Sequence, residues 1–293
     1  MNGIIIKAIS GFYYVFFDGQ IYECKARGNF RKAEVSPVVG DRVEFSLISD
    51  NHGIVEKILD RKNLLSRPII ANIDKLFIIS AYKTPSPDLL MIDRLTAVCA
   101  YHNIEPIVVF NKCDMGDFSE FEKIYTNSGF KTYVVSAENN IGLDGIVLEL
   151  KDCISAFSGN SGVGKSSILN AVFSDFSLKT GEVSEKLGRG RHTTRHTELY
   201  PHKYGGFVAD TPGFSSFEVD NTDYDFKLHL AECFPEFNEY SDLCRFVGCS
   251  HTCEKGCAVL EAVNDGIIEK SRHSSYKSIY DELKDLKQWQ SNK

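Results

Sequence analysis

The sequence contains the octapeptide Gly159-Asn160-Ser161-Gly162-Val163-Gly164-Lys165-Ser166, which fits the phosphate-binding pattern G-x-x-x-x-G-K-S. It follows an apolar run, 153–157, that is typical of a strand, and it precedes a segment with helical character, 167–173. At such a helix N-terminus the backbone N–H groups cradle phosphates, Lys165 reaches the β and γ oxygens, and Ser166 ligates Mg²⁺. Because a chance glycine-rich turn would lack these flanking elements, we predict a nucleotide site that extends to Ser167.

A second motif, Asn111-Lys112-Cys113-Asp114, lies upstream at the end of the apolar run 106–110. The Asp114 carboxylate can accept hydrogen bonds from the ring N–H and exocyclic amine of guanine, which adenine does not offer as a pair. The stem of Lys112 would lie over the base. Ser136-Ala137 follows the run 132–135 and would offer backbone N–H groups to the guanine carbonyl, although this dipeptide alone is a weak signal. Together with Asn111, these residues predict a pocket that selects GTP over ATP.

The order of the two motifs is unusual. Ordinary GTPases carry the phosphate loop before the guanine-binding motif, whereas this chain carries it after. Near-continuous apolar runs at 75–80 and 106–110 are typical of parallel strands covered on both faces, and 89–101 has helical periodicity. We therefore predict a circularly permuted P-loop GTPase domain built on a doubly wound α/β sheet.

The motif that would sense the γ-phosphate, Asp210-Thr211-Pro212-Gly213, ends a predicted strand, 206–209. Asp210 would hold Mg²⁺ through water, and the Gly213 N–H would donate to the γ-phosphate. A plain Pro-Gly turn would not explain the strand and the aspartate together. Phe214 stands where Ras-like enzymes place a glutamine that orients water. Since phenylalanine cannot polarise water, we expect slow intrinsic hydrolysis.

A glycine-hinged basic segment, 188–195, lies between the phosphate loop and Asp210. Its threonines, Thr193 and Thr194, can cap Mg²⁺, and we assign the metal-ligand role to Thr194. His192 can position the attacking water once the loop orders. The alternative, that His192 is a solvated loop residue or an RNA phosphate contact, stays open. The neighbouring arginines can equally meet RNA backbone: Arg189, Arg191 and Arg195.

Residues 1–66 are predicted to form an N-terminal barrel. The Asp18-Gly19 pair separates two apolar-aromatic runs, 11–17 and 20–24, and is a strong hairpin signal. Apolar side chains then alternate at period two over 42–48, as a half-buried strand requires. About five short strands without a helix favour a closed β-barrel of OB type, which buries its edges.

Four of the nine cysteines crowd between residues 244 and 257. This density is typical of a metal site and not of unrelated reduced cysteines. Three thiolates and one imidazole are the ligand set of a closed, structural zinc site, although Cys253 is a spare thiol and spacing alone leaves the ligands open. The candidate ligands are Cys244, Cys249, His251 and Cys257. The tail, 267–290, is predicted to be a polar helix with these residues on its surface: Glu269, Lys270, Arg272, Lys277 and Lys284.

The composition is that of a soluble globular chain of two or three domains, with 43% hydrophobic residues and a mean hydropathy of -0.19. The start has neither a signal peptide nor a membrane span, so we expect a cytoplasmic protein whose cysteines stay reduced and which does not bind membranes. A net charge of -7 gives no global attraction to nucleic acid, so RNA contacts would come from local basic patches. A monomer is the default expectation.

Over nearly its whole length, these motifs and their permuted order resemble the RsgA family, the ribosome small-subunit-dependent circularly permuted GTPases of bacteria. The resemblance implies a late maturation factor that binds the small ribosomal subunit and its rRNA through the barrel and the zinc domain, and that hydrolyses GTP to GDP faster there. It implies that His192 is the catalytic group, and that Cys253 is not one of the zinc ligands. The three parts would be an RNA-binding OB domain, 1–66, the GTPase domain, 67–218, and a mostly helical zinc-binding domain, 219–293.

Two other interpretations remain. The chain would be a GTP-dependent binding module if it barely hydrolyses GTP, or a permuted GTPase tied to another RNA or to a protein. For the three-part GTPase that we predict, we expect GTP with Mg²⁺ to order the loops at Thr193-Thr194 and Gly213. Hydrolysis would release them, shift the zinc domain and weaken the grip on RNA.

Overall fold

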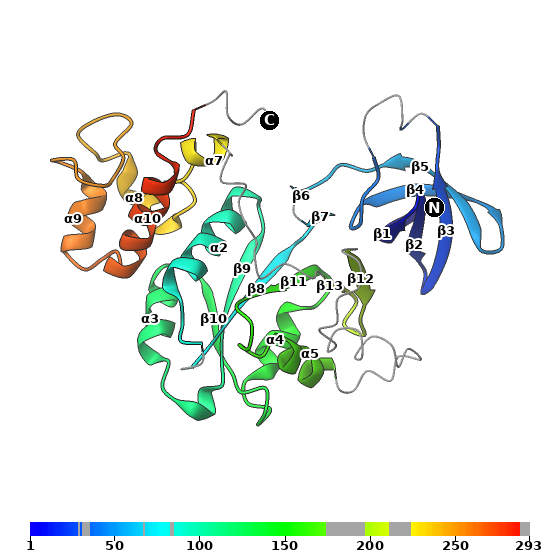
Figure 1. Ribbon diagram of the computed structural model, residues 1–293, viewed down its shortest axis with the longest axis horizontal. Helices are drawn as coiled ribbons and strands as arrows, with labels where there is room; N and C mark the ends of the chain where they lie inside the picture. Colours follow the sequence, from blue (N-terminus) through cyan, green and yellow to red (C-terminus); the bar gives the residue numbers. More distant parts are fainter. Residues whose placement is uncertain are drawn as a thin grey trace.

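The computed structural model describes residues 1–28, 30, 36–66, 68–82, 85–173, 197–210 and 224–287. The chain forms three parts: a barrel, a central α/β sheet, and a small helical part that lies on the opposite side of the sheet from the barrel (Figure 1). None of the helices in these ranges has the length and apolar composition that a membrane crossing requires.

The barrel confirms the predicted OB type. Its strands pair in the order β1-β2-β3-β5-β4, and β1 also pairs with β4 to close it. Phe17 faces Gln20 across a two-residue turn in which Asp18 and Gly19 both have positive φ, 48° and 75°, as the predicted hairpin requires. The interior is filled by alternating side chains such as Val15 and Val43. The strands are β1 Asn2–Ile9, β2 Phe12–Phe17, β3 Gln20–Ala26, β4 Arg42–Ser49 and β5 His52–Ile58.

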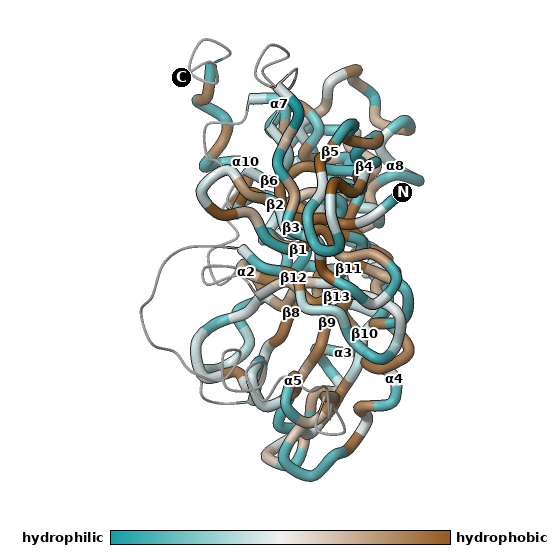
Figure 2. The backbone as a smooth tube through the Cα atoms, turned by 90° about the vertical axis from the view of Figure 1, so that its right-hand side faces the viewer, coloured by the Kyte–Doolittle hydropathy of each residue, from teal (hydrophilic) through white to brown (hydrophobic). Residues whose placement is uncertain are grey.

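The central sheet confirms the doubly wound α/β prediction. Its strands lie in the order β10-β9-β8-β11-β13-β12, and all are parallel except β12, which is antiparallel to β13. The hydrophobic colour of Figure 2 follows β8 and β9, which are buried on both faces. The strands are β8 Lys75–Ala81, β9 Glu105–Asn111, β10 Lys131–Val134, β11 Ile154–Ser158, β12 Glu198–Pro201 and β13 Phe207–Asp210. A short hairpin, β6 Leu64–Ser66 and β7 Ile69–Ala71, precedes β8.

Helices cover both faces of this sheet. On one face, side chains of α2 and α3 pack against Ile78 and Val108. On the other, side chains of α4 and α5 pack against Ile79 and Val109. Alternate residues of each strand therefore place their side chains in two separate hydrophobic cores, one on each face of the sheet. These helices are α2 Leu89–Tyr101, α3 Ser119–Asn127, α4 Leu143–Glu149 and α5 Lys165–Phe173, with a short 3-10 turn at Cys113–Met115.

The barrel joins the sheet through strand pairing. Lys7 of β1 lies opposite Glu198 of β12, and the Lys7 Nζ to Glu198 Oε1 distance is 3.1 Å. The rings of Phe16 and Phe207 meet edge to face, with centroids 5.5 Å apart. The strands of the barrel and of the GTPase sheet thus form one continuous hydrogen-bonded ladder.

The C-terminal part packs on α2 and shares the hydrophobic core on that face of the sheet. Its last helix, α10, packs directly along α2 (Figure 1). The elements are α7 Tyr224–Leu228, a 3-10 turn at Pro235–Phe237, α8 Asn238–Ser241, α9 Ala258–Asn264 and α10 Lys270–Leu283.

The prediction that Arg272 lies on the surface is wrong, because its side chain is fully buried between α10 and α2. Arg272 Nη1 donates to Asp93 Oδ1 at 2.8 Å, and Nε donates to Glu236 Oε1 at 2.7 Å. The guanidinium also lies over the rings of Phe130 and Phe234, 4.9 and 4.7 Å from their centroids. Two carboxylates and two aromatic faces compensate the charge, which is what permits its burial. Lys270, Lys277 and Lys284 are exposed as predicted.

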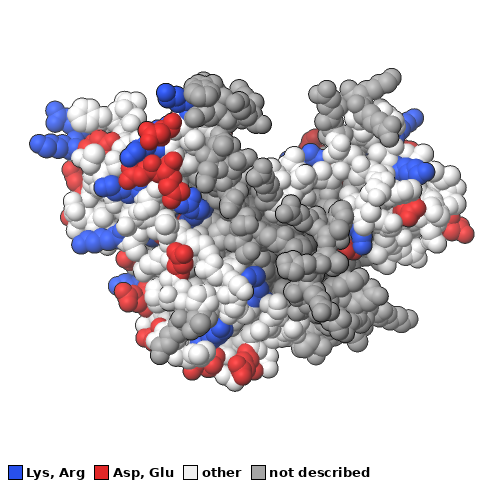
Figure 3. Space-filling view, in the orientation of Figure 1, with Lys and Arg blue, Asp and Glu red and all other residues white. Residues whose placement is uncertain are grey.

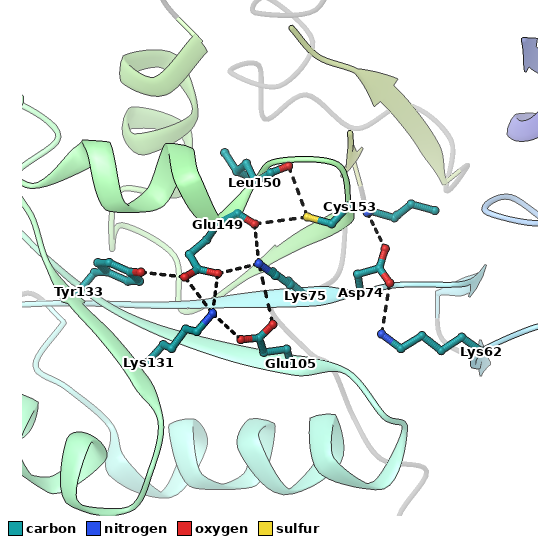
Figure 4. Close-up of polar contacts among 10 residues, drawn as sticks. Lys62, Asp74, Lys75, Glu105, Lys131, Tyr133, Glu149, Leu150 and Cys153 are labelled. Carbon is teal, nitrogen blue, oxygen red and sulfur yellow. Dashed lines mark hydrogen bonds and ion pairs between the residues drawn. The ribbon is translucent and has the colours of Figure 1, made fainter. Parts of the chain in front are cut away.

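A cluster of charged side chains closes the end of the sheet where the parallel strands begin (Figure 4). Its centre is Glu149 at the end of α4, whose side chain is 11% exposed. Lys75 Nζ lies 2.6 Å from Glu149 Oε2, Lys131 Nζ lies 3.0 Å from Oε1, and the Tyr133 hydroxyl donates to Oε1 at 2.9 Å. Burial alone would raise the pKa of Glu149, but these hydrogen bonds lower it below its ordinary value.

We expect Glu149→Gln to lower the free energy of unfolding at neutral pH by about 1–3 kcal/mol, because two lysines lose their shared carboxylate. The folded-state pKa lies below the ordinary 4.5, so this stabilisation is present above that pH and is lost as pH falls through the folded-state pKa. Urea unfolding of both proteins should therefore show a gap at neutral pH that narrows in acid. Lys62→Met, which removes the exposed pair with Asp74, is the control and should cost less than about 1 kcal/mol.

Candidate functional site

Three loops meet at the edge of the sheet where its parallel strands end. They follow β9, β10 and β11, and they contain the tetrad at 111–114, the Ser136-Ala137 turn and the phosphate loop at 159–164. Since these strands are parallel neighbours of β8 or of each other, their loops open on the same side. Segments that are far apart in the sequence thus build one site.

Two glycines of the phosphate loop are required by their surroundings. Gly159 has φ 141°, and a Cβ there would lie 2.1 Å from the carbonyl oxygen of Ile79. Gly164 has φ 94°, and a Cβ there would lie 2.2 Å from Asn111 Nδ2. A side chain at either position would collide with a neighbouring strand or with the tetrad, so the loop can only approach them closely as glycine.

Lys165 is the first residue of α5, and its side chain turns back over the loop. Its Nζ donates to the carbonyl oxygens of Gly159 and Asn160 at 2.6 and 3.0 Å. Burial lowers the pKa of this lysine. Ser166 and Ser167 follow in the first helical turn and are exposed at the mouth of the site. A cation and a helix N-terminus therefore face the same point, as an anion site requires.

Asn111 connects the phosphate loop to the Ser136-Ala137 turn. Its side chain is buried, Nδ2 donates to the carbonyl oxygen of Val163 at 2.9 Å, and Oδ1 accepts from the Ala137 N–H at 3.1 Å. The Ala137 N–H, expected to face the guanine carbonyl, is engaged here because a buried amide must satisfy its acceptor. The sequence does not predict this bridging role, since the partners of Asn111 lie 52 and 26 residues away.

The other tetrad side chains border the same loops. Lys112 adopts a left-handed conformation, φ 67°, and its Nζ donates to the carbonyl oxygen of Gly162 at 2.7 Å. Its stem thus runs beside the phosphate loop. Asp114 is exposed, and its carboxylate accepts a hydrogen bond from the buried Ser136 hydroxyl. The structure therefore brings the predicted base-contacting residues together with the phosphate loop.

Several predicted residues lie outside the described ranges. Asp210 ends β13, which runs parallel to β11, so its backbone reaches the edge of the sheet that carries the phosphate loop. The predicted residues that lie outside the described ranges are His192, Thr193, Thr194, Thr211, Pro212, Gly213, Phe214, Arg189, Arg191 and Arg195.

Three thiols and one imidazole converge in the C-terminal part, from Cys244, Cys249, His251 and Cys257, with all ligand atoms within 4.8 Å of one another. A tetrahedral ion with bonds of about 2.3 Å to sulfur and 2.0–2.1 Å to nitrogen would separate its donors by about 3.8 Å for S···S and about 3.6 Å for S···N. The Cys244 and Cys257 sulfurs are 3.8 Å apart, and they lie 3.6 and 3.5 Å from His251 Nδ1. This donor set fits a tetrahedral metal ion.

Neighbouring groups fix the loop that carries these ligands. His273 Nε2 of α10 donates to the His251 carbonyl oxygen at 2.7 Å, and the Tyr276 hydroxyl donates to the Ser250 carbonyl oxygen at 2.8 Å. Cys253 is exposed and is not part of the cluster. The cluster is therefore docked onto α10, which itself packs on α2.

We expect Cys257→Ala to weaken metal binding by more than about 100-fold, the upper range for losing a supporting group beside a metal. The Cys257 thiol is buried, and it lies 3.8 Å from the Cys244 sulfur and 3.5 Å from His251 Nδ1. Metal content after dialysis and thermal unfolding would measure this. Cys253→Ser is the matched control and should keep the metal; its loss from that variant would show that the spare thiol is a ligand.

The chain matches two family models: the RsgA N-terminal domain over residues 2–55 and the RsgA GTPase over residues 58–220. Curated relatives named small ribosomal subunit biogenesis GTPase RsgA include those of Caldanaerobacter subterraneus subsp. tengcongensis and Ruminiclostridium cellulolyticum. Each is 44% identical to this chain. The match to the first covers 97% of this chain and 96% of the relative, and the match to the second covers 99% of this chain and 96% of the relative.

Solved structures agree with these sequence matches. YjeQ from Thermotoga maritima superposes with a TM-score of 0.85 at 32% identity, covering 98% of this chain and 99% of that one. YloQ, described as a circularly permuted GTPase, superposes with a TM-score of 0.81 at 34% identity, covering 97% and 95%. The phosphate loop follows the guanine-binding motif in the sequence, and both meet in one site. The chain therefore belongs to the RsgA family of circularly permuted GTPases.

Proposed function

We propose that this GTPase binds the small ribosomal subunit and its rRNA late in maturation, and hydrolyses GTP to GDP and phosphate with turnover that the subunit stimulates. The names of its relatives support the biological role. The observation that carries the chemistry is the position of Asn111, which ties the phosphate loop to the turn at Ala137. We place this activity in the cytoplasm, in a monomer.

The site residues divide the substrate between them. Asp114 would accept from the guanine edge while Lys112 covers the base, which rejects ATP by leaving the carboxylate unpaired. Lys165 and the loop N–H groups hold the phosphates, and the Gly213 N–H meets the γ-phosphate. Ser166, Thr194 and Asp210 would hold Mg²⁺, which neutralises charge on the phosphate oxygens.

The four-residue metal cluster would hold one structural Zn²⁺ per chain. Three thiolates and one imidazole are a zinc ligand set, and four protein ligands leave no position for water. Its role is to fix the loops of the domain that we assign to residues 219–293, beside the OB domain at 1–66 and the GTPase domain at 67–218.

The contacts between the parts suggest where the nucleotide state acts. Arg272 fixes the zinc domain to α2, away from the loops that contact the phosphates. β12 directly follows the segment that contains Thr194, and it carries the β1 strand of the barrel. We therefore propose that GTP hydrolysis acts on the barrel through β12, as well as on the zinc domain, which follows β13 along the chain.

The decisive experiment measures phosphate release from GTP with and without purified small subunits. Stimulated release that saturates with subunit supports the proposed function. Subunit binding without release would indicate a GTP-dependent binding module, and neither binding nor stimulation would indicate another RNA or protein partner.

We expect His192→Ala to retain GTP binding and to lose subunit-stimulated turnover, by about 10²–10⁴-fold if the imidazole acts as a general base. Stopped-flow phosphate release and GTP titration separate the two steps. His196→Ala, four residues further along the chain, is the matched control. Unchanged stimulated turnover in the His192 variant would remove its catalytic role.

A further inference from the structure

The chain on either side of Cys244, the first metal-cluster cysteine, exposes apolar side chains. Leu243 is 70% exposed, Phe246 is 54% exposed, and Val247 is fully exposed. We name these three residues, with Arg245 and Lys255, the knuckle tip. Exposed single apolar residues are common, but here an aromatic ring and two aliphatic side chains are exposed within five positions, and a concentration of apolar surface marks an interaction site.

The knuckle tip is held in place by its own loop. The Arg245 N–H donates to the Gly256 carbonyl oxygen at 2.9 Å, and the Arg245 stem lies over Gly256, where a Cβ would come within 3.1 Å of it. The guanidinium then lies 5.4 Å from the centre of the Phe246 ring. Since the metal-cluster residues Cys244 and Cys249 bracket this segment, the ring and the cation are presented together from a fixed base.

The charge of the knuckle tip is positive and unpaired. In the part of the chain that the structure describes, neither Arg245 nor Lys255 forms an ion pair. Figure 3 shows Lys and Arg side chains projecting at the left-hand end of the molecule, where the loops before α9 lie in Figure 1.

The neighbouring Glu254 does not cancel this charge by pairing with either cation. Its carboxylate accepts from the N–H groups of Ser250, Thr252 and Cys253 at 2.8, 3.1 and 3.1 Å. Burial alone would raise its pKa, but hydrogen bonds from Ser250 and Cys253 lower the pKa to about 2. The Glu254 carboxylate thus holds the loop through these hydrogen bonds, and Arg245 and Lys255 remain available to an anionic partner.

We propose that the knuckle tip binds unpaired nucleotides of RNA, with the Phe246 ring stacked on a base and Arg245 and Lys255 on the adjoining phosphates. Single-stranded RNA offers both a flat apolar face and negative charge, which is the complement of this patch. An apolar protein surface would cover Phe246 and Val247 but would strip water from two cations without pairing them. The inference deepens the proposed function and rests on its RNA partner.

The test uses the full chain with its metal and compares Phe246→Ala with the native protein in binding to purified small subunits. Losing one base stack should weaken binding about tenfold, within the range known for such aromatic residues. Phe246→Trp should bind at least as well as the native chain. Leu228→Ala is the control, because this side chain is also exposed, at 58%, but lies on α7 away from the knuckle tip. Metal content and GTP affinity should be unchanged in all three variants.

A second measurement separates RNA from protein as the partner. Lys255→Ala should reduce the dependence of binding on salt concentration by about one released counterion. Ultraviolet crosslinking of the complex should join residues 245–247 to unpaired nucleotides. Crosslinks only to a ribosomal protein, or native affinity in Phe246→Ala, would overturn the inference while leaving the proposed function intact.

Single-stranded oligouridine keeps the test independent of the subunit. If native protein binds no subunits, the proposed function fails, and the knuckle tip is then judged on the oligouridine alone. Weaker binding and lost crosslinks in Phe246→Ala would support the nucleotide site. Equal binding by both proteins, without crosslinks to residues 245–247, would reject it.

Discussion

Replacing Lys165 with alanine is expected to abolish GTP binding at micromolar concentrations. The Nζ lies at the mouth of the phosphate loop, where it would exchange the carbonyls of Gly159 and Asn160 for two phosphate oxygens. Hydrogen bonds to charged groups contribute about 1.5–3 kcal/mol each, so losing two weakens binding by roughly 10²–10⁴-fold. Titration with a fluorescent GTP analogue measures this. Lys151→Ala, an exposed lysine at the other end of the sheet, is the control.

The pH dependence of GTP affinity is a second test of the role of Lys165 in phosphate binding. Burial lowers the pKa of Lys165 from its ordinary value of 10.5. Bound phosphate favours the protonated amine, so affinity is full below the lowered pKa and falls as pH rises through it. At millimolar GTP, where residual binding by the alanine variant is measurable, this decline should be absent. If Lys165→Ala keeps native affinity, the phosphate-loop assignment is wrong.

Arg272→Ala is expected to lower the free energy of unfolding by about 3–5 kcal/mol, because it leaves two buried carboxylates without their cation. Asp93 is buried beside it, and Tyr125 and Thr96 belong to the same hydrogen-bonded network. Urea unfolding, followed by both intrinsic fluorescence and metal release, measures the total loss and shows whether the zinc domain separates first.

The chain supplies a matched control for this variant. Arg94 and Glu282 also join α2 to α10, with an Nη2 to Oε1 distance of 2.6 Å, but their side chains are 23% and 45% exposed. Arg94→Ala should therefore cost about 1 kcal/mol or less. Equal losses in the two variants would mean that burial of Arg272 contributes nothing to holding α10 on α2.

Local patterns in the sequence predict much of the fold because they reflect local causes. The helix expected at 89–101 begins and ends at the same residues in the structure, where the Asp88 carboxylate caps it by accepting from the Met91 N–H. The apolar runs at 75–80 and 106–110 become the central strands β8 and β9, because a strand buried on both faces is apolar along its length. The pairing of β1 with β12 carries no such signal, since its partners lie 191 residues apart.

The same limit applies to the site and to Arg272. Motif order and residue type are enough to predict which loops bind the nucleotide, but not that Asn111 bridges them. A single arginine in a polar helix is predicted to lie on the surface. Its contact with Asp93, 179 residues away, forms only in the folded chain. Cysteine spacing alone likewise leaves Cys253 open as a ligand, whereas in the folded loop it lies outside the cluster.

The strand ladder shared by barrel and sheet also governs how the parts tolerate separation. A fragment that began after β5 would expose the backbone edge of β12 that β1 now occupies. Bare strand edges recruit other chains and promote aggregation. The barrel therefore covers this edge of the GTPase sheet, and we expect a fragment without β1 to aggregate more readily.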